Sequence, residues 1–169
     1  MNSIAPVAFS KDKTIWKNKL NNDKSLKEAY IKVVNDYNLF INNDLIEENI
    51  LTILKNKFDN TLERTKDKYD RYDFISDKYL IELKSRKFNM NKYNTTIITK
   101  HKIIKTHKVL MFVFNFDDYL TYYIYNEEDI KTNKCYFKLG GRTDRGFIET
   151  YNLLNIPINL LTIINQKQF

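Results

Sequence analysis

The sequence predicts a mixed α/β domain in which two helices precede most of the strands, and three observations predict it. Two capped amphipathic segments follow each other in the N-terminal third of the chain. A tight hairpin with period-2 alternation spans residues 71–84, and a strongly apolar run at 109–116 is typical of a central strand. A chain of 169 residues is about one domain in size, so we expect a single domain over residues 1–169.

The helices are predicted from caps and periodicity. In SLKEAYIKVVNDY, Ser25 and Glu28 have the spacing of a capping box. The apolar residues that follow repeat with the period of a helix: Leu26, Ala29, Tyr30, Val33, Val34 and Tyr37. In the next segment, DLIEENILTILKNKF, Asp44 and Glu47 have the same capping-box spacing. Its expected buried face is formed by Ile46, Ile50, Ile53 and Leu54. A second helix should therefore follow the first directly.

The strands are predicted from alternation and apolar runs. Residues 60–66 suggest a short first strand, and 71–76 and 79–84 alternate around the polar break SDK, which predicts a hairpin. The segment NTTIITKHKIIKTH is rich in β-branched residues, yet Ile97 and Ile104 stand seven apart with lysines between them. We interpret residues 95–106 as a helix. VLMFVFNF and YLTYYIY then predict a central strand and its partner, joined by a turn at Asp117–Asp118.

Toward the C-terminus, all three glycines of the chain lie in the stretch GGRTDRG, at positions 140, 141 and 146. Glycine permits positive φ or close backbone approach, and Arg142 and Arg145 add two fixed positive charges. The stretch is therefore either a phosphate-contacting loop or an ordinary turn after the strand CYFKL. Pro157 then introduces a closing apolar segment, INLLTII.

Composition limits the class of protein. The net charge of +7 favours a polyanionic partner, nucleic acid above all, although an A/T-biased genome alone would also enrich lysine. The same bias suggests a phage or a large DNA virus as the source. Cys135 is the only cysteine, which excludes an intramolecular disulfide and a multi-cysteine zinc site. The chain shows neither a signal peptide nor an apolar run long enough to cross a membrane, so we expect a soluble intracellular protein.

The hairpin YDFISDKYLIELKSR contains the main candidates for catalytic residues. With a two-residue turn at Asp77–Lys78, opposed positions sum to 155, so Asp73 lies across from Glu82, and Lys84 returns to the same face. The opposite face is apolar and is formed by Tyr72, Phe74, Tyr79, Ile81 and Leu83. Two like charges in opposed positions destabilise a hairpin unless something neutralises them. Mg²⁺ or Mn²⁺ would do so, since one or two carboxylates with water and substrate phosphate satisfy these ions. With an ammonium group beside the metal, the pattern indicates phosphodiester hydrolysis.

At Asp73 and the ELK of residues 82–84, the sequence resembles the PD-(D/E)xK nuclease superfamily, which has the restriction-endonuclease-like fold. The resemblance implies an αβββαβ core with a mixed central sheet flanked by helices, and it spans residues 44–116. Residues 1–40 would then be an N-terminal helical extension, and residues 117–169 would add C-terminal strands and the GGRTDRG loop. In one departure, Tyr72 stands where the proline of the motif's name would be.

The resemblance also assigns roles to residues. Asp73 and Glu82 would bind the metal together with the Leu83 carbonyl, and Lys84 would assist the attacking water. Either Glu47 or Glu48 could supply a further acid from the preceding helix, although an exposed acidic first turn explains both. The expected nucleic-acid contacts are Arg86, Lys100, Lys102, Arg142 and Arg145. His101 and His107 have no acid at ligand spacing, and a turn position explains Asp77, so none of these three receives a role.

The function that follows is a Mg²⁺- or Mn²⁺-dependent endonuclease acting on DNA, and charge and resemblance together favour double-stranded DNA. Two alternatives stay open from the sequence. One is a noncatalytic nucleic-acid-binding protein that keeps the nuclease-like fold, and the other is an RNA endonuclease with the same metal chemistry. Because cutting both strands of a duplex commonly needs two active sites, we expect a homodimer or a larger symmetric assembly.

Overall fold

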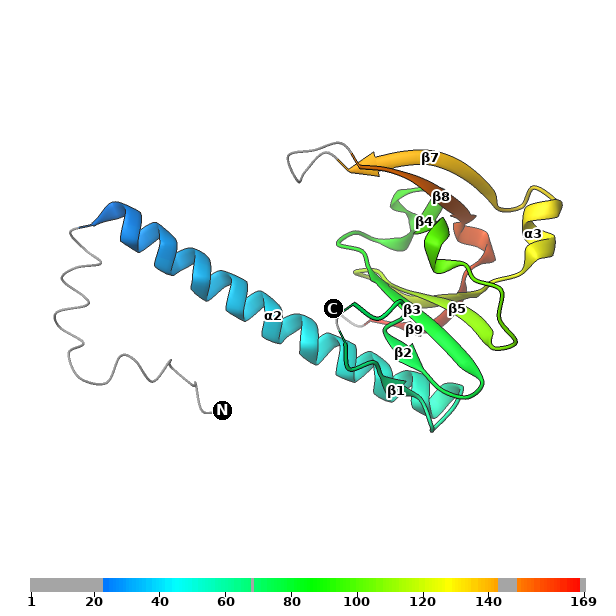
Figure 1. Cartoon of the computed structure of the whole chain (residues 1–169), viewed down its shortest axis with the longest axis horizontal. Coiled ribbons are helices and arrows are strands. Elements are labelled where there is room, and N and C mark those ends of the chain that lie inside the picture. The colour runs from blue at the N-terminus through cyan, green and yellow to red at the C-terminus, as the bar shows by residue number, and fades with distance from the viewer. Residues whose placement is uncertain (1–22, 68, 143–148, 168–169) are drawn as a thin grey trace. The chain divides into compact units, whose positions relative to one another are not determined.

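The computed structural model describes residues 23–67, 69–142 and 149–167 of the chain. The chain forms two compact units, Met1–Ile50 and Leu51–Phe169. The first described element is the long helix α2, Lys24–Lys57, which begins in the first unit and ends in the second (Figure 1). Within these described ranges no helix is long and apolar enough to cross a membrane.

One helix forms where the sequence predicted two. α2 runs without a break through the expected boundary near Asp44, because no glycine or proline interrupts it. Ser25 is also not the cap. The carboxylate of Asp23 accepts hydrogen bonds from the backbone N–H groups of Ser25 (3.0 Å) and Leu26 (3.1 Å). The pair Asp44–Glu47 lies inside the helix, where the N–H groups that a cap would satisfy are already bonded.

Burial along α2 differs from its N-terminal to its C-terminal part. Ile50, Leu51 and Leu54 are buried, as the predicted apolar face of the second helix requires, whereas Ile46 is exposed. In the first unit most of the apolar stripe that the sequence predicted faces solvent, for example Val33. The N-terminal part of the helix therefore presents apolar side chains without a covering layer among the described residues.

The second unit contains a six-stranded mixed sheet in the order β1-β2-β3-β5-β6-β9 (Figure 1). β3 and β5 are parallel, and every other neighbouring pair is antiparallel. The mixed central sheet and the extra C-terminal strands confirm the predicted fold class, and the short strand predicted at 60–66 exists as β1. The strands are β1 Glu63–Arg64, β2 Phe74–Ile75, β3 Tyr79–Ser85, β5 Val109–Asn115, β6 Tyr119–Ile124 and β9 Thr162–Gln166.

A second sheet of three strands, in the order β4-β8-β7, contains a correction to the sequence interpretation. Residues 95–106 are not a helix. Thr95–Thr99 forms β4, which pairs with β8, Glu149–Pro157, and a short 3₁₀ turn, η3 (Lys100–Lys102), follows. The β-branched residues favoured the strand, and pairing with a strand more than fifty residues away decided it. The remaining elements are η2 Met90–Lys92, α3 Glu127–Lys131, β7 Tyr136–Arg142 and η4 Ile158–Leu160.

The glycine-rich stretch is partly a strand. Gly140 and Gly141 lie in β7 and pair with Tyr151 and Thr150 of β8. A Cβ atom at Gly140 would lie 2.6 Å from Leu153 Cδ1, so glycine at this position permits the close approach of a neighbouring side chain. Arg145 and Gly146 lie outside the described residues, and of Arg142 only the strand position is described.

The two sheets pack face to face, and this packing positions the site. Phe112 and Phe114 of β5 belong to one buried cluster with Ile98, Leu154 and Ile156 of the second sheet. Glu82 and Lys84 pair in register with these two phenylalanines, so they share the face that the second sheet covers. On the opposite face, the Phe58 ring lies 6.2 Å from the Tyr79 ring and 5.0 Å from that of Tyr122. The acids therefore lie on the face between the two sheets.

Candidate active site

The β2–β3 hairpin has the register that the sequence predicted. Phe74 pairs with Ile81 and Ile75 pairs with Leu80, so opposed positions sum to 155. The Ser76 N–H donates to the Tyr79 carbonyl (3.0 Å), which closes the two-residue turn at Asp77–Lys78. Asp73 and Glu82 are consequently brought to the same end of the hairpin.

Regular pairing stops at Phe74, and Asp73 lies just beyond the ladder. Its backbone N–H donates to the Ile81 carbonyl (2.9 Å), and its carboxylate Oδ2 accepts the Leu83 N–H at 2.6 Å. The Asp73 carboxylate is therefore fixed to the backbone of β3 next to Glu82. Because the N–H and C=O of one strand residue point to the same side, the Leu83 carbonyl is on this side of β3 as well.

Glu82 is the buried centre of the site, with only 2% of its surface exposed. Lys84 Nζ forms an ion pair with Oε1, and Lys102 Nζ lies 2.7 Å from Oε2. The approach of Lys102 has the distance of an ion pair but not the angle of a hydrogen bond, so Oε2 is a buried oxygen that accepts no hydrogen bond. Two ammonium groups thus supply the positive charge that a buried carboxylate requires.

The environment of Asp73 disfavours its charged form. Burial raises its pKa to about 6, and the negative charge of Glu82 acts in the same direction. The Leu83 N–H and the ammonium groups of Lys84 and Lys102 oppose this shift without cancelling it. Asp73 is therefore a carboxylate at neutral pH that takes up a proton in mildly acidic solution.

Lys102 reaches the site from η3. The Tyr72 hydroxyl donates to the Lys102 carbonyl (2.8 Å), and Lys102 Nζ donates to the Arg71 carbonyl, so both ends of this residue are held against the segment before β2. Of the two lysines that the sequence analysis gave as nucleic-acid contacts in this segment, the structure brings Lys102 to Glu82. The ammonium of Lys100 instead lies 5.5 Å from the centre of the Phe137 ring.

Arg86 links the two sheets at the end of β3. Its guanidinium donates to the Ile97 carbonyl of β4 (2.7 Å), and burial lowers its pKa. This hydrogen bond holds the side chain against the backbone of β4, so the phosphate contact that the sequence predicted for it stays a prediction.

His101 is a neighbour of the site to which the sequence analysis gave no role. Burial lowers its pKa, as do the charges of Lys102, Arg71 and Lys84, while Glu82 raises it. The imidazole is therefore neutral at physiological pH and lies within electrostatic reach of Glu82. In the sequence, only its position next to Lys102 could have indicated that His101 lies near the site. That indication depends on knowing that η3 brings Lys102 to Glu82. His107 is exposed, as expected.

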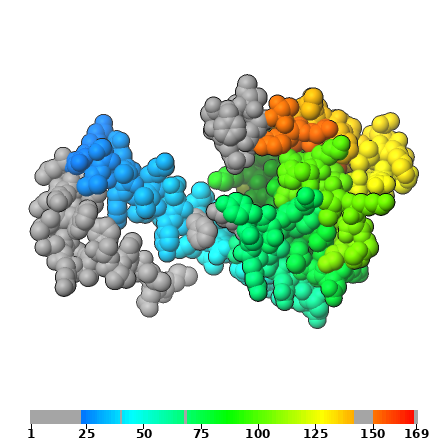
Figure 2. Space-filling view, viewed as in Figure 1, coloured from blue at the N-terminus to red at the C-terminus, as the bar shows by residue number. Residues whose placement is uncertain are grey.

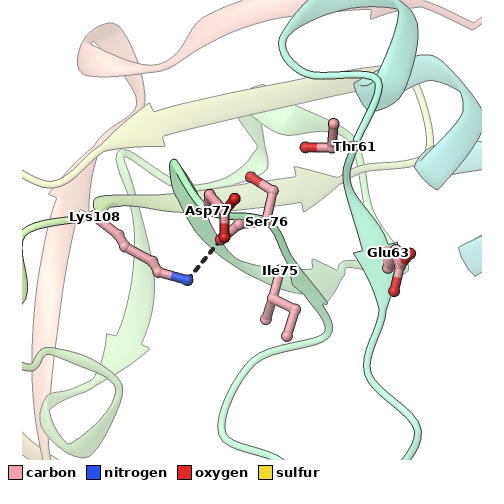
Figure 3. A pocket seen from close by; sticks show the side chains of 6 residues that line it. All are labelled: Thr61, Glu63, Ile75, Ser76, Asp77 and Lys108. Atoms are coloured by element: carbon pink, nitrogen blue, oxygen red, sulfur yellow. Dashed lines mark hydrogen bonds between the residues drawn. The ribbon is translucent and has the colours of Figure 1, made fainter.

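The turn acid Asp77 lies apart from these groups. It lines a cleft of about 280 Å³ at the hairpin turn, together with Thr61, Glu63, Ile75, Ser76 and Lys108 (Figure 3). Lys108 Nζ donates to the Ser76 carbonyl across this cleft at 2.7 Å. The cleft contains neither Asp73 nor Glu82, in agreement with a turn role for Asp77.

The further acids of the prediction, Glu47 and Glu48, lie on the part of α2 that belongs to the first unit. Glu47 is half-buried and Glu48 is exposed. Their contribution to the site stays a prediction.

Comparison with known proteins shows to which family the chain belongs. Residues 42–164, well over half of the chain, match the model of the family described as "Phage putative PDDEXK endonuclease". The chain belongs to this family. This PDDEXK protein is accordingly a member of the nuclease superfamily that the motif at Asp73 and Glu82 indicated, and the word phage in the description agrees with the source suggested by composition. No curated protein and no solved structure matches the chain.

Removing the second cation beside Glu82 tests the importance of Lys102. We expect Lys102→Met to lower the rate of nucleic-acid cleavage by about 10- to 100-fold, because one positive charge beside Glu82 is lost while the length of the side chain is kept. Initial rates on a fixed substrate at saturating Mg²⁺ measure the effect. Lys105→Met is the matched control, since Lys105 is exposed and lies only three residues further along the chain. Equal losses in the two variants would contradict a specific role for Lys102.

Proposed function

We propose that the chain is a divalent-metal-dependent endonuclease that hydrolyses phosphodiester bonds in DNA. The observation that carries the proposal is the buried carboxylate of Glu82, which Lys84 and Lys102 contact and whose charge raises the pKa of Asp73. Burying two carboxylates together costs free energy, and structures that keep such pairs usually use them. Membership of a PDDEXK family supports the hydrolytic chemistry.

The donor atoms fit Mg²⁺ or Mn²⁺. Asp73 and Glu82 offer carboxylate oxygens, which these ions prefer. Glu82 Oε2 is contacted by the Lys102 ammonium, so a metal bound at this oxygen would take the place of that cation. The Leu83 carbonyl is a third oxygen on the same side of β3. When bound, the metal supplies a polarised phosphoryl oxygen and a water of lowered pKa. The described residues hold no group of three or more His, Cys, Asp or Glu side chains suited to a metal, so water and substrate oxygens would complete the shell.

Lys84 and Lys102 are proposed to position the attacking water and to stabilise the charge that develops on the phosphate. Lys84 shares its face with Glu82 and is partly exposed, so its ammonium can both hold the attacking water and reach the substrate phosphate. Lys102 adds a second charge that stabilises the negative charge developing on the phosphate oxygens. The Asp73 carboxylate is oriented by the Leu83 N–H.

Nucleic-acid binding is proposed to use the positive charge of the chain. Lys100 and Lys102 lie on η3, and Arg86 directly follows β3, the strand that carries Glu82. Arg142 and Arg145 of the glycine-rich stretch are proposed to contact phosphate as well. DNA is favoured over RNA by the resemblance to restriction-endonuclease-like enzymes, and a dependence on ionic strength is expected for either polymer.

Cleavage assays test the proposal. Purified protein is incubated with plasmid, linear duplex, branched DNA and single-stranded RNA, with Mg²⁺, Mn²⁺ or EDTA. We expect metal-dependent cleavage of DNA that ends when EDTA is added. Binding without cleavage of any substrate would favour the noncatalytic alternative, and cleavage of RNA alone would favour the RNA endonuclease. Isothermal titration with Mn²⁺ provides an independent measurement, because its heat should be lost in Asp73→Ala.

A further inference from the structure

The ammonium group of Lys102 lies against the oxygen of Glu82 that a metal ion would also use. Lys102 Nζ is 2.7 Å from Glu82 Oε2, and only 15% of the Lys102 side chain is exposed. Carboxylate oxygens are the ligands that Mg²⁺ and Mn²⁺ prefer, but an ammonium group and a divalent ion at the same oxygen would repel each other strongly. Lys102 and a metal ion therefore compete for Oε2.

Lys102 is held in this position at both ends. The hydroxyl of the buried Tyr72 donates to the Lys102 carbonyl (2.8 Å), and Lys102 Nζ donates to the Arg71 carbonyl. A surface lysine loses side-chain entropy when it forms an ion pair, and this loss cancels much of the gain. Lys102 is already ordered by these contacts, so its ion pair with Glu82 retains more of its free energy. A metal ion has to replace this interaction, and its affinity is lowered accordingly.

The charges of the site can balance in two ways. The carboxylates of Asp73 and Glu82 are balanced by the ammonium groups of Lys84 and Lys102. A divalent ion bound to the same two carboxylates would balance them by itself, so neither lysine would be needed there. Each phosphate of a nucleic acid carries one negative charge and can become the new partner of an ammonium group. Charge balance therefore favours Lys102 at Glu82 before a metal ion binds and at phosphate afterwards.

The position of η3 allows this change. The turn follows β4 directly, and His101, the neighbour of Lys102, is exposed. Figure 2 shows green residues of this part of the chain beside the orange residues of β8 at the molecular surface, as the pairing of β4 with β8 requires. Lysine has a flexible four-carbon stem. The ammonium group can therefore leave Oε2 while the backbone of Lys102 keeps its hydrogen bond to Tyr72.

We propose that Lys102 is an internal cation that neutralises Glu82 in the metal-free site and moves to the substrate phosphate when a metal ion binds. The inference rests on the proposed metal-dependent function and adds a form of regulation to it. Metal and nucleic acid each favour the arrangement in which Lys102 has left Glu82. Each ligand therefore raises the affinity of the chain for the other by the same factor. Lys102 thus keeps metal binding weak until substrate is present.

Isothermal titration with Mn²⁺, without nucleic acid, tests the competition. Lys102→Met should bind Mn²⁺ at least about 10-fold more tightly than the wild type, because the competing charge beside Glu82 is removed. Lys105→Met removes an exposed lysine three residues further along the chain, and its affinity should stay within about 2-fold of the wild type. Circular dichroism shows whether both variants are folded.

The outcomes of the titration separate the two proposals. Binding by Lys102→Met that is equal to or weaker than that of the wild type would overturn the inference about Lys102 and leave the metal site in place. No binding by the wild type or by either variant would overturn the metal site and the inference together.

Covalent labelling of the wild type tests the movement without any variant. The full chain is treated briefly with acetic anhydride at constant pH, with and without saturating Mn²⁺, and labelled peptides are measured by mass spectrometry. Without metal, Lys102 should be labelled more slowly than Lys105, because its ammonium group is held in a buried ion pair. With Mn²⁺, the labelling of Lys102 relative to Lys105 should rise at least about 3-fold, because Lys102 leaves Glu82. A ratio that Mn²⁺ leaves unchanged or lowers, in a chain that binds Mn²⁺, would overturn the inference.

Discussion

Glu82→Gln is expected to lower the rate of DNA cleavage by 100-fold or more while preserving the shape of the side chain. The glutamine side chain would occupy the same space, but it carries no charge to hold a divalent metal. The two ammonium groups that contact Glu82 would also lose their buried anionic partner. Single-turnover cleavage of a duplex at saturating protein and Mg²⁺ measures the loss in the chemical step.

The control for Glu82→Gln is Asp77→Asn, which removes one acid from the same hairpin at its exposed turn. Its cleavage rate should stay within about 2-fold of the wild type, because surface substitutions away from special features have small effects. Circular dichroism of both variants shows whether the fold is kept. Full activity of a folded Glu82→Gln variant would remove Glu82 from the reaction and, with it, the proposed site.

Local patterns predicted the register of the hairpin correctly. Alternation around SDK fixed both the turn and the register, because a shift of one residue would have moved Phe74 and Ile81 out of the core. The same reasoning placed Lys84 on the face of Glu82. The end of the ladder was not predictable, since Asp73 leaves regular pairing to bond the Ile81 carbonyl and the Leu83 N–H.

Nonlocal contacts caused the main error. The stretch 95–106 contains both a helical spacing of isoleucines and a run of β-branched residues, and within the segment nothing decides between them. The decision comes from β8, whose residues 153–157 pair with β4 in the folded chain. The position of Lys102 beside Glu82 depends on the same pairing of β4 with β8, because β4 leads directly into η3. Sequence reasoning could therefore name Lys102 as a candidate but could not separate it from Lys100.

The prediction that a first helix ends before Asp44 was wrong for a different reason. An acid followed three residues later by glutamate is a start signal only where free N–H groups exist. Asp44 and Glu47 have this spacing in the middle of a continuous helix, where the pattern has no capping function. The absence of glycine and proline between Tyr37 and Asp44 was the better guide.

Asp73→Asn is expected to make the metal-free protein more stable at pH 8 while removing metal binding. Between its unfolded pKa near 3.8 and its folded pKa of about 6, the folded chain binds more protons at Asp73 than the unfolded chain does. The unfolding free energy of the wild type therefore falls as the pH rises through this window. The asparagine side chain does not titrate, and its oxygen can still accept the Leu83 N–H. The variant should gain on the order of 1–2 kcal/mol at pH 8, after allowance for partial exposure, and nothing at pH 4.

Urea unfolding in EDTA at pH 4 and pH 8 measures this gain in unfolding free energy. The same experiment with Mn²⁺ measures how much metal binding to Asp73 stabilises the folded chain. A metal that binds the folded wild type stabilises it by mass action, so Mn²⁺ should raise the wild-type midpoint at pH 8 and leave that of Asp73→Asn unchanged. At pH 4 the wild type should lose this response as Asp73 takes up its proton. A variant that is less stable than the wild type at pH 8 in EDTA would mean that the Asp73 charge contributes to folding and is not strained by Glu82. A variant that is more stable than the wild type at pH 8 in EDTA would show that the neighbouring carboxylates of Asp73 and Glu82 destabilise the metal-free fold, as expected for a pair that binds a metal.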